Sequence, residues 1–476
     1  MNRSFNKTKI IATTGPASCT PEHLFNLVNA GVDVFRLNFS HGTYEDHAKI
    51  VDNIKDINRT HKTDIGILAD LQGPKIRIGE LENGKIDIAP GDIINFTTEE
   101  CVGNKDCLYL SYPNFPKDVT VGEKILLDDG KFEMEVTKTD KKTRVTAKVI
   151  YGGELFPKKG VNLPNTKISL PSLTEKDLKD LDFAISKTAN WIALSFVRCA
   201  DDILELKKIL KEKGSTAKVI AKIEKPEACN NIDEIIQVTD AIMIARGDLG
   251  VEVPMEEGPM IQKEIVRKSR KLAKPVIIAT QLMDSMIKNP RPTRAETTDV
   301  ANAVLDGADA LMLSGETSVG ANPVLVVEAL EKIITNIECE DHIYYKLQSP
   351  DKKSPTFLSD AVCYNACVLA EEISAKAIIG MTRSGYTGFM VSSMRPKADI
   401  FVFTDNPALR YSMSMTFGVR TFFYDKMVST DDTINDLKNY LKENGLLKKG
   451  DIVVNVASMP LEDQGRTNML KVSKID

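Results

Sequence analysis

The sequence predicts an α/β protein, namely a (β/α)8 TIM barrel with an inserted all-β lid domain and a C-terminal α/β domain. Eight short apolar segments end in polar or glycine residues, and helical periodicity fills most of the gaps between them. Eight strands alternating with helices are typical of a parallel barrel. Between the third and fourth segments the chain changes to period-two stretches rich in Val, Ile, Thr and Gly, which indicates an insertion.

The eight barrel strands are expected from their apolar runs and polar ends. In chain order they are residues 9–13, 34–38, 65–71, 191–196, 218–223, 241–246, 275–280 and 310–314. Two helix starts are also marked, by Thr20 before Pro21 and by a capping box from Thr293 to Glu296. Active sites of such barrels lie at the carboxyl ends of the strands, so the polar residues there are the candidate functional residues.

Domain limits follow from the changes of pattern. Residues 1–75 with 171–340 are expected to form the barrel, and residues 76–170 the all-β lid, with a turn at Asp128-Asp129-Gly130 and a hairpin tip at 138–142. An insertion at a strand's carboxyl end could close over the site. Residues 341–476 form the third domain, with a helix at 358–373 and strands at 377–380, 400–403, 420–423 and 452–456.

Composition excludes several classes of function. The 476 residues are 42% hydrophobic and 27% charged, and the net charge of −5 argues against a general nucleic-acid binder. No apolar run approaches the ~18 residues of a membrane span. The eight cysteines form no C-x-x-C pair, and Cys363 and Cys367, four apart on a predicted helix, are expected to be buried thiols. We therefore expect a cytoplasmic protein with no membrane partner.

One group of charged residues suggests phosphoryl chemistry. Lys222 and Glu224 alternate on one strand and so face the same side, and Asp248 follows the next strand. A buried cation beside two carboxylates needs partners, and the set suits a divalent metal and a phosphorylated anion. A structural ion-pair cluster inside the barrel is the alternative.

Two other strand ends carry charged and polar residues. Arg36, Asn38 and Ser40 sit at alternate positions after the second strand, where an arginine can bind a carboxylate or a phosphate through two hydrogen bonds. Asp70 and the run from Lys75 to Arg77 leave the third strand. Each could be a solvated surface group, but their shared position at strand ends favours a binding role.

Taken together, these motifs resemble the pyruvate kinase family over essentially the whole chain. The segments that carry the resemblance are residues 13–18, 36–42, 70–77, 159–164, 222–224, 245–250, 279–283 and 312–317. The resemblance implies transfer of the phosphoryl group of phosphoenolpyruvate to ADP, giving pyruvate and ATP. It also implies a homotetramer.

The resemblance assigns roles around the substrate. Glu224 and Asp248 would bind Mg2+, which Mn2+ could replace, because hard carboxylate oxygens suit such ions. Lys222 would stabilise charge on the transferring phosphoryl group and the enolate, while Arg36 holds the phosphate. Gly247 and Asp248 would lie near the substrate carboxylate, and Thr280 near the enolate carbon.

Further residues match the family's other contacts. Arg77 and Lys159 resemble nucleotide-phosphate contacts, with Asn38, Phe39, Ser40 and His41 lining the same pocket. Glu316 and Ser314 are candidates for a proton relay with Thr280, with purely structural hydrogen bonding as the alternative. His41 is not assigned acid–base work.

A candidate monovalent-cation site separates subgroups of the family. Many members bind K+ through residues that match Asn38, Ser40, Asp70 and the carbonyl of Leu71. Those members carry glutamate where this chain has Lys75. The resemblance to members with lysine there implies K+ independence, because a tethered ammonium can supply the missing charge.

In the third domain, a hydroxyl-rich turn resembles the family's effector-binding loop through Thr382, Ser384, Gly385 and Thr387. A phosphate could bind at such a helix start, although plain helix capping explains the spacing as well. Residues 464–468 could close over a sugar phosphate or nucleotide effector. Two other functions were weighed: a Mg2+-dependent aldolase or lyase, which would not need Arg77 or Lys159, and a non-catalytic metabolite sensor.

Overall fold

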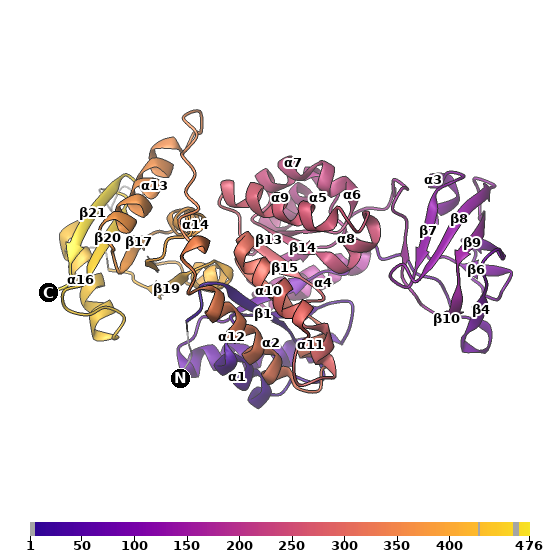
Figure 1. Cartoon of the computed structure of the whole chain (residues 1–476), viewed down its shortest axis with the longest axis horizontal. Helices are drawn as coiled ribbons and strands as arrows, with labels where there is room; N and C mark the ends of the chain where they lie inside the picture. Colours follow the sequence, from indigo (N-terminus) through magenta and orange to yellow (C-terminus); the bar gives the residue numbers. More distant parts are fainter. Residues whose placement is uncertain (1–4, 427–428, 460–465) are drawn as a thin grey trace.

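The computed structural model describes residues 5–426, 429–459 and 466–476. Three bodies follow one another along an elongated molecule (Figure 1). The barrel lies in the middle, the inserted β domain at one end and the C-terminal domain at the other. This arrangement confirms the predicted fold class.

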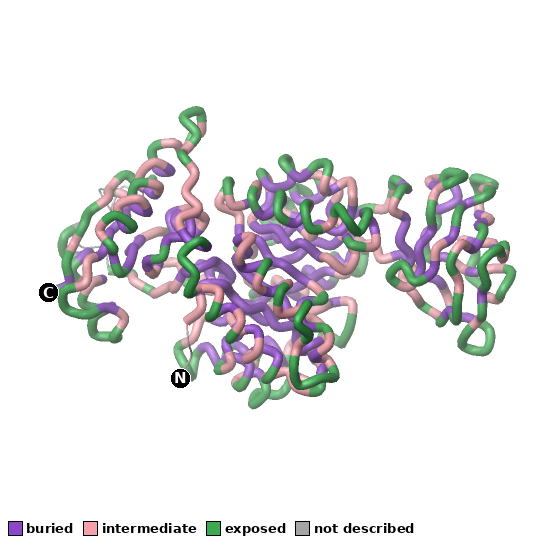
Figure 2. Tube along the Cα trace, in the orientation of Figure 1, coloured by how far each residue is buried: buried purple, intermediate pink, exposed green. Residues whose placement is uncertain are grey.

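The central domain is a closed parallel barrel with the strand order β1-β16-β15-β14-β13-β12-β3-β2. Its strands are β1 Lys9–Thr13, β2 Val34–Asn38, β3 Gly66–Asp70, β12 Trp191–Leu194, β13 Lys218–Ile223, β14 Ala241–Ala245, β15 Val276–Ala279 and β16 Ala310–Leu313. Each strand lies inside a predicted segment, so all eight predictions are confirmed. The strands are buried in Figure 2, as expected for a sheet covered by helices.

Helices and short turns surround the barrel and cover its sheet. They are α1 Pro21–Ala30, α2 Tyr44–His61, α4 Glu175–Ser186, α5 Ala200–Glu212, α6 Pro226–Asn230, α7 Ile232–Val238, α8 Arg246–Glu252, α9 Gly258–Lys271, α10 Arg294–Asp306, α11 Gly315–Ser318 and α12 Pro323–Ile337. Both predicted helix starts are confirmed: Thr20 accepts a hydrogen bond from the His23 amide, and Thr293 and Glu296 form a capping box. None of the helices in the described ranges is both long and apolar enough to cross a membrane.

The inserted domain leaves the barrel after β3 and returns before β12. Its strands are β4 Ile86–Ile88, β5 Ile93–Thr97, β6 Cys107–Tyr109, β7 Lys124–Leu127, β8 Phe132–Thr139, β9 Arg144–Tyr151, β10 Gly153–Leu155 and β11 Val161–Asn162, with one short helix, α3 Phe115–Asp118. They pair in a six-stranded and a two-stranded sheet around a separate apolar core. The predicted turn at Asp128-Asp129-Gly130 joins β7 to β8, with all three residues at positive φ.

The C-terminal domain is a five-stranded sheet with the order β19-β18-β17-β20-β21. Its elements are α13 Phe357–Glu372, β17 Ala377–Met381, α14 Tyr386–Ser393, β18 Asp399–Thr404, α15 Pro407–Ser412, β19 Val419–Phe423, α16 Thr430–Glu443, β20 Ile452–Ala457 and β21 Met469–Lys474. The predicted helix and four strands are confirmed, and β21 is an additional antiparallel strand. Cys363 and Cys367 are buried on α13, and all eight cysteines are free.

A buried ion pair joins this domain to the barrel. The Arg395 guanidinium lies 2.9 Å from Asp309 Oδ1 and also donates to the carbonyl of Gly307. The Phe417 amide donates to the same Asp309 oxygen. Arg395 is 1% exposed, so its charge depends on these partners.

Candidate active site

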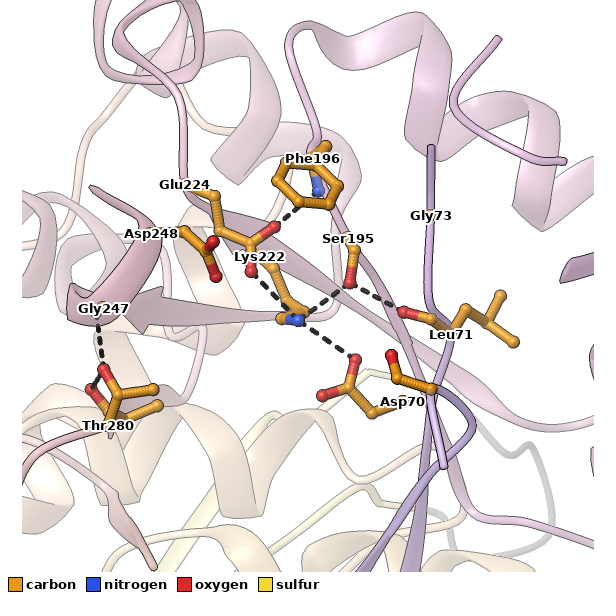
Figure 3. Close-up of polar contacts among 12 residues, drawn as sticks. Asp70, Leu71, Gly73, Ser195, Phe196, Lys222, Glu224, Gly247, Asp248 and Thr280 are labelled. Carbon is orange, nitrogen blue, oxygen red and sulfur yellow. Dashed lines mark hydrogen bonds and ion pairs between the residues drawn. The ribbon is translucent and has the colours of Figure 1, made fainter. Parts of the chain in front are cut away.

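Lys222 is the centre of a polar cluster at the carboxyl end of the barrel (Figure 3). Its Nζ lies 3.2 Å from Asp70 Oδ1, 3.0 Å from Glu224 Oε1 and 2.8 Å from the Ser195 hydroxyl. Ser195 in turn donates to the carbonyl of Leu71. Three different strand ends, those of β3, β12 and β13, therefore meet around one ammonium group, because parallel strands in a barrel all end at the same rim.

The cluster keeps Lys222 charged. Burial alone would lower the pKa of Lys222, but the adjacent Asp70 and Glu224 carboxylates outweigh it and raise that pKa. Burial would raise the pKa of Asp70, but Lys222 and Arg36 hold it below its ordinary value. The site thus presents a fixed cation with an ionised partner.

Arg36 is held rigidly beside the same carboxylate. From the middle of β2, its Nε and Nη2 both lie 2.7 Å from Asp70 Oδ2, and its Nη1 donates to the Thr13 hydroxyl at 3.0 Å. A guanidinium fixed on both sides loses little freedom when it binds an anion. Arg36 and Lys222 therefore form a preorganised pair of cations on opposite sides of Asp70.

Glu224 and Asp248 lie next to one another on the side of Lys222 away from Asp70 (Figure 3). Glu224 Oε2 accepts the Phe196 amide at 2.7 Å, and Lys75 Nζ lies 3.9 Å from Asp248 Oδ1. Burial raises the pKa of Glu224, the Lys222 ammonium opposes this shift, and the Asp248 carboxylate adds to it. Two carboxylates that repel each other in a partly buried place suit a bound cation.

Protein groups alone do not complete a metal site here. Across residues 5–426, 429–459 and 466–476, no set of three or more His, Cys, Asp and Glu side chains is placed to hold a metal ion. Mg2+ is commonly held by one or two carboxylates, with water and substrate oxygens as its other ligands. The donor set of Glu224 and Asp248 fits that pattern.

Thr280 is strained where it follows β15. Its φ of 66° is rare for a β-branched residue, and Gln281 after it is also at positive φ. The Thr280 hydroxyl accepts the Gly247 amide at 2.7 Å and donates to the Ala279 carbonyl at 2.6 Å. Such strain persists where surrounding contacts impose it, and it concentrates at functional sites.

Arg246 supplies some of those contacts. Its Nη2 donates to the Thr280 carbonyl at 2.9 Å and its Nε to the Ala279 carbonyl at 3.4 Å, while Nη1 lies 2.7 Å from Asp299. The residue belongs to α8, which also carries Gly247 and Asp248. One short helix therefore positions both the strained threonine and a candidate metal ligand.

Comparison with known proteins identifies the family. The model "Pyruvate kinase, barrel domain" matches residues 5–327, and the model "Pyruvate kinase, alpha/beta domain" matches residues 360–473. The chain belongs to the pyruvate kinase family. The enzyme of Geobacillus stearothermophilus is 42% identical over 98% of this chain and 80% of its own length. The enzyme of Mycobacterium intracellulare is 42% identical over 98% of both chains.

A solved structure agrees with the family assignment. A pyruvate kinase from Cryptosporidium parvum matches with a TM-score of 0.92 and 35% identity, covering 99% of this chain and 96% of that one. The barrel, the inserted sheet domain and the C-terminal domain therefore correspond to the architecture of a pyruvate kinase.

The predicted nucleotide residues fall into two groups. Arg77 forms an isolated antiparallel β-bridge with Gly160, which brings its backbone close to Lys159. The Nζ of Lys159 lies 2.8 Å from Asp128 Oδ1. The other group, residues 38–41, follows β2 on the barrel. Its Ser40 amide donates to Asn38 Oδ1, and His41 is exposed while its carbonyl bonds His47 Nε2.

Phe39 differs from its neighbours. Its ring is 4% exposed and packs against His47 and Phe183 in the apolar shell. Its side chain therefore contributes packing, so a contact with nucleotide would have to come from its backbone.

The predicted monovalent-cation ligands also come together. Asn38 pairs with Asp70 in the β2–β3 register, and Ser40 follows within two residues. The Leu71 carbonyl accepts the Ser195 hydroxyl at 2.7 Å, and Asp70 is engaged by Arg36 and Lys222. Protein donors thus already meet three of the four candidate ligands, because Asn38 Oδ1 also accepts the Ser40 amide.

A contact across the lid boundary joins the lid to α8. Glu252 Oε1, at the end of α8, accepts both Asn162 Nδ2 at 2.9 Å and Lys225 Nζ at 2.6 Å. Asn162 belongs to β11 of the lid, and Gly130 of the lid turn lies against Val251. The lid therefore docks on the helix that carries Asp248.

The candidate relay and effector residues make mainly local hydrogen bonds. Glu316 is 2% exposed and accepts the amides of Ser314 and Met283, the structural role that the sequence left open. In the effector loop, the Gly385 amide donates to the Thr382 hydroxyl and the Tyr386 amide to Ser384, as in helix capping.

The end of the effector loop is closed. The buried Thr387 hydroxyl lies 2.7 Å from that of Thr467, and Arg466 Nη1 donates to the carbonyl of Pro355. Gln464 and Gly465 of the predicted closing segment lie outside the described residues.

Sequence reasoning missed three contributors to the site. Ser195 bridges Lys222 and Leu71, Arg246 holds Thr280, and Asn162 connects the lid to α8. Ser195 follows an apolar strand just as Asp70 does, so its strand-end position was a usable signal. The partners of Arg246 and Asn162 come from distant segments, which no local pattern reveals.

Proposed function

We propose that this protein transfers the phosphoryl group of phosphoenolpyruvate to ADP, giving pyruvate and ATP, with the cluster around Lys222 as its active site. Membership of the pyruvate kinase family supports the reaction. The observation that carries the residue assignment is Lys222, whose side chain is only 12% exposed at the barrel rim and is kept charged by Asp70 and Glu224.

Arg36 and Lys222 would bind the phosphoryl group. Both cations are already oriented, by Thr13 and Asp70 for Arg36 and by Ser195 for Lys222, so little reorganisation is needed as charge develops. Phosphoryl transfer depends mainly on such positioning and electrostatic stabilisation. Lys222 would also stabilise the enolate oxygen that forms as the phosphoryl group leaves.

Glu224 and Asp248 would hold Mg2+, or Mn2+ in its place. Their mutual repulsion and their oxygen donors fit a divalent ion. When bound, that ion supplies positive charge next to the phosphoryl and enolate oxygens. Gly247 directly precedes Asp248, and the substrate carboxylate would approach this part of the backbone.

Thr280 would take part in protonation of the enolate carbon. Its hydroxyl is positioned by the Gly247 amide and by the backbone strain that Arg246 helps to maintain. A threonine hydroxyl is a weak acid, so a proton would reach the enolate through water. The contacts of Glu316 and Ser314 with the backbone favour a structural role for both.

The nucleotide would lie between the barrel and the lid. Arg77 and Lys159 would bind its phosphates from the lid, with Asn38, Ser40, His41 and the Phe39 backbone on the barrel side. The adjacent positions of Arg77 and Gly160 support this grouping. Docking of Asn162 on Glu252 offers a way for lid closure to act on α8.

Other parts of the proposal concern ions, effectors and assembly. Lys75, 3.9 Å from Asp248, would replace the charge of K+ at the site formed by Asn38, Ser40, Asp70 and Leu71. The loop of Thr382, Ser384, Gly385 and Thr387 would bind a sugar phosphate or nucleotide effector. We further propose a cytoplasmic homotetramer, on the basis of the family alone.

The test is pyruvate formation from phosphoenolpyruvate and ADP with Mg2+, for wild type and Lys222→Met. We expect Mg2+-dependent turnover in the wild type and a loss of at least about a hundredfold in the variant, because one preorganised charge is removed. Lys187→Met, which removes a lysine outside the cluster that pairs with Asp52, is the control and should keep full activity.

The same assay separates the alternatives. A sensor would bind phosphoenolpyruvate without turnover, and an aldolase or lyase would consume it without ADP. Retention of Lys222, Glu224 and Asp248 in one cluster argues against the sensor. The lid with its Arg77 and Lys159 argues against the lyase.

A further inference from the structure

A cavity of about 860 Å3 lies between the barrel and the C-terminal domain, away from the active site. Its barrel side comes from α7, the end of α9, the start of β13 and the loop before β15, and its other side from residues 346–356 and from α14. Cavities of this size are typical of small-molecule sites. The lining includes Tyr386 and Phe389 but none of residues 382–385 of the effector loop.

Three half-buried cations on the barrel side of the lining lack an acidic partner. Among the described residues, no carboxylate lies within ion-pair distance of Lys218, Arg270 or Lys274. Lys274 donates to the Thr239 carbonyl at 2.6 Å, and Lys218 lies over the Phe389 ring at 5.3 Å from its centroid. Arg270 Nε is buried and has no hydrogen-bond partner in the described part of the chain.

The acidic residues of the cavity are already engaged. Asp240 pairs with Lys207 at 2.8 Å and accepts the Val219 amide, and Asp233 pairs with Lys268 at 3.0 Å. Asp360 accepts the hydroxyl of Thr356. These carboxylates therefore form no ion pair with the three cations, although Asp240 partly offsets the charge of Lys218 and Lys274.

Burial makes this arrangement costly without an anion. It lowers the pKa of Lys218 and Lys274 although Asp240 opposes the shift, and it lowers the pKa of Arg270 to about 10 although Asp309 opposes it, and neighbouring cations add to each shift. An isolated buried charge is unfavourable unless it is paired and hydrogen-bonded. A doubly charged anion in the cavity would offset this cost.

We propose that this cavity binds a small phosphate-bearing molecule. A phosphate group carries negative charge that can balance these cations. Its oxygens can accept hydrogen bonds from a guanidinium and from ammonium groups at the same time. The Phe389 ring and Met390 give the cavity an apolar wall for the rest of the molecule. The proposal does not rest on catalytic activity, since the cavity and the Lys222 cluster share no residue.

The test is calorimetric titration of the full-length protein with inorganic pyrophosphate, in EDTA to exclude metal complexes. We expect saturable binding that weakens at least tenfold in Arg270→Met and in Lys274→Met. Lys268→Met is the matched control: this lysine lines the same cavity but is paired with Asp233 and Glu264, so its loss should change affinity less than twofold. If Arg270→Met does not fold, Lys274→Met carries the comparison.

Two further variants distinguish this cavity from the other phosphate sites. Lys222→Met removes a cation of the active site, and Ser384→Ala alters the effector loop. Binding that survives both but is lost in the cavity variants supports the proposal. Absence of saturable binding overturns it, as does binding that is unchanged in Arg270→Met and Lys274→Met.

Discussion

Removal of the Arg246 side chain should slow turnover by releasing Thr280 from its strained conformation. In the structure Arg246 donates to the carbonyls of Thr280 and Ala279 and is itself held by Asp299. A positive φ at a threonine costs on the order of 1–3 kcal/mol, so the loop relaxes if its contacts are removed. Arg246→Met removes them without leaving a buried charge on the variant side chain.

The size of the effect follows from the lost hydrogen bonds. A hydrogen bond from a charged donor contributes about 1.5–3 kcal/mol. If ~2 kcal/mol of that positions the Thr280 hydroxyl for the transition state, kcat should fall about thirtyfold. KM for phosphoenolpyruvate should change much less, because Arg36 and Lys222 keep their own supports.

The assay is steady-state pyruvate formation, with Asp299→Asn as the matched control. That variant keeps the Arg246 bonds to both carbonyls and weakens only their support, so kcat should fall less than fivefold. A kcat of Arg246→Met within twofold of wild type would refute the reasoning. So would a rise in KM with kcat unchanged, since that pattern indicates lost substrate binding.

Three other predictions concern ions, stability and pH. Lys75→Glu removes the ammonium near Asp248, so activity without K+ should fall at least tenfold and return when K+ is added; activity that ignores K+ in both proteins would contradict this. Arg395→Met leaves Asp309 buried without its cation and should lower the free energy of unfolding by about 3–5 kcal/mol in a denaturant titration. Asp309→Asn should lower the free energy of unfolding less in the Arg395→Met background than in wild type. If the effects of the two substitutions are strictly additive, the pairing is contradicted. Burial lowers the pKa of His47, so the unfolded chain binds its proton first and stability should fall as pH drops through about 6.5. His47→Gln should reduce that slope in thermal melts from pH 7.5 to 5.5, and an equal slope would exclude His47 as the cause.

The strand ends of the barrel were predictable because their signal is local. A buried parallel strand is typically a short apolar run, and polar residues at its end or just after it lie at the rim. Asp70 is the last residue of β3, and Asp248 lies three residues after β14. The capping signals at Thr20 and Thr293 are equally local and were confirmed. By contrast, β21 has exposed and half-buried residues in no regular alternation, so the sequence carries only a weak strand pattern there although the strand pairs with β20.

The contacts within the site could not be predicted in the same way. Ser195 can contact both Lys222 and Leu71 only because three strands lie at the right spacing. Arg246 can donate to the Thr280 carbonyl only because α8 turns back over β15. Thr280 itself shows why: a threonine is disfavoured at positive φ, so only tertiary contacts reveal that the backbone adopts it there.

The position of the lid has a consequence for the order of folding. β3 and β12 are neighbours in the barrel, yet the hydrogen bond from the Ile67 amide to Asn190 Oδ1 spans 123 positions of sequence. The inserted chain leaves and returns side by side, since the Val161 amide donates to the Ile76 carbonyl. An insert that folds first shortens the loop to about 40 free residues and lowers the entropic cost of closing the barrel by about 1 kcal/mol. Early folding of the lid would therefore hasten pairing of β3 with β12.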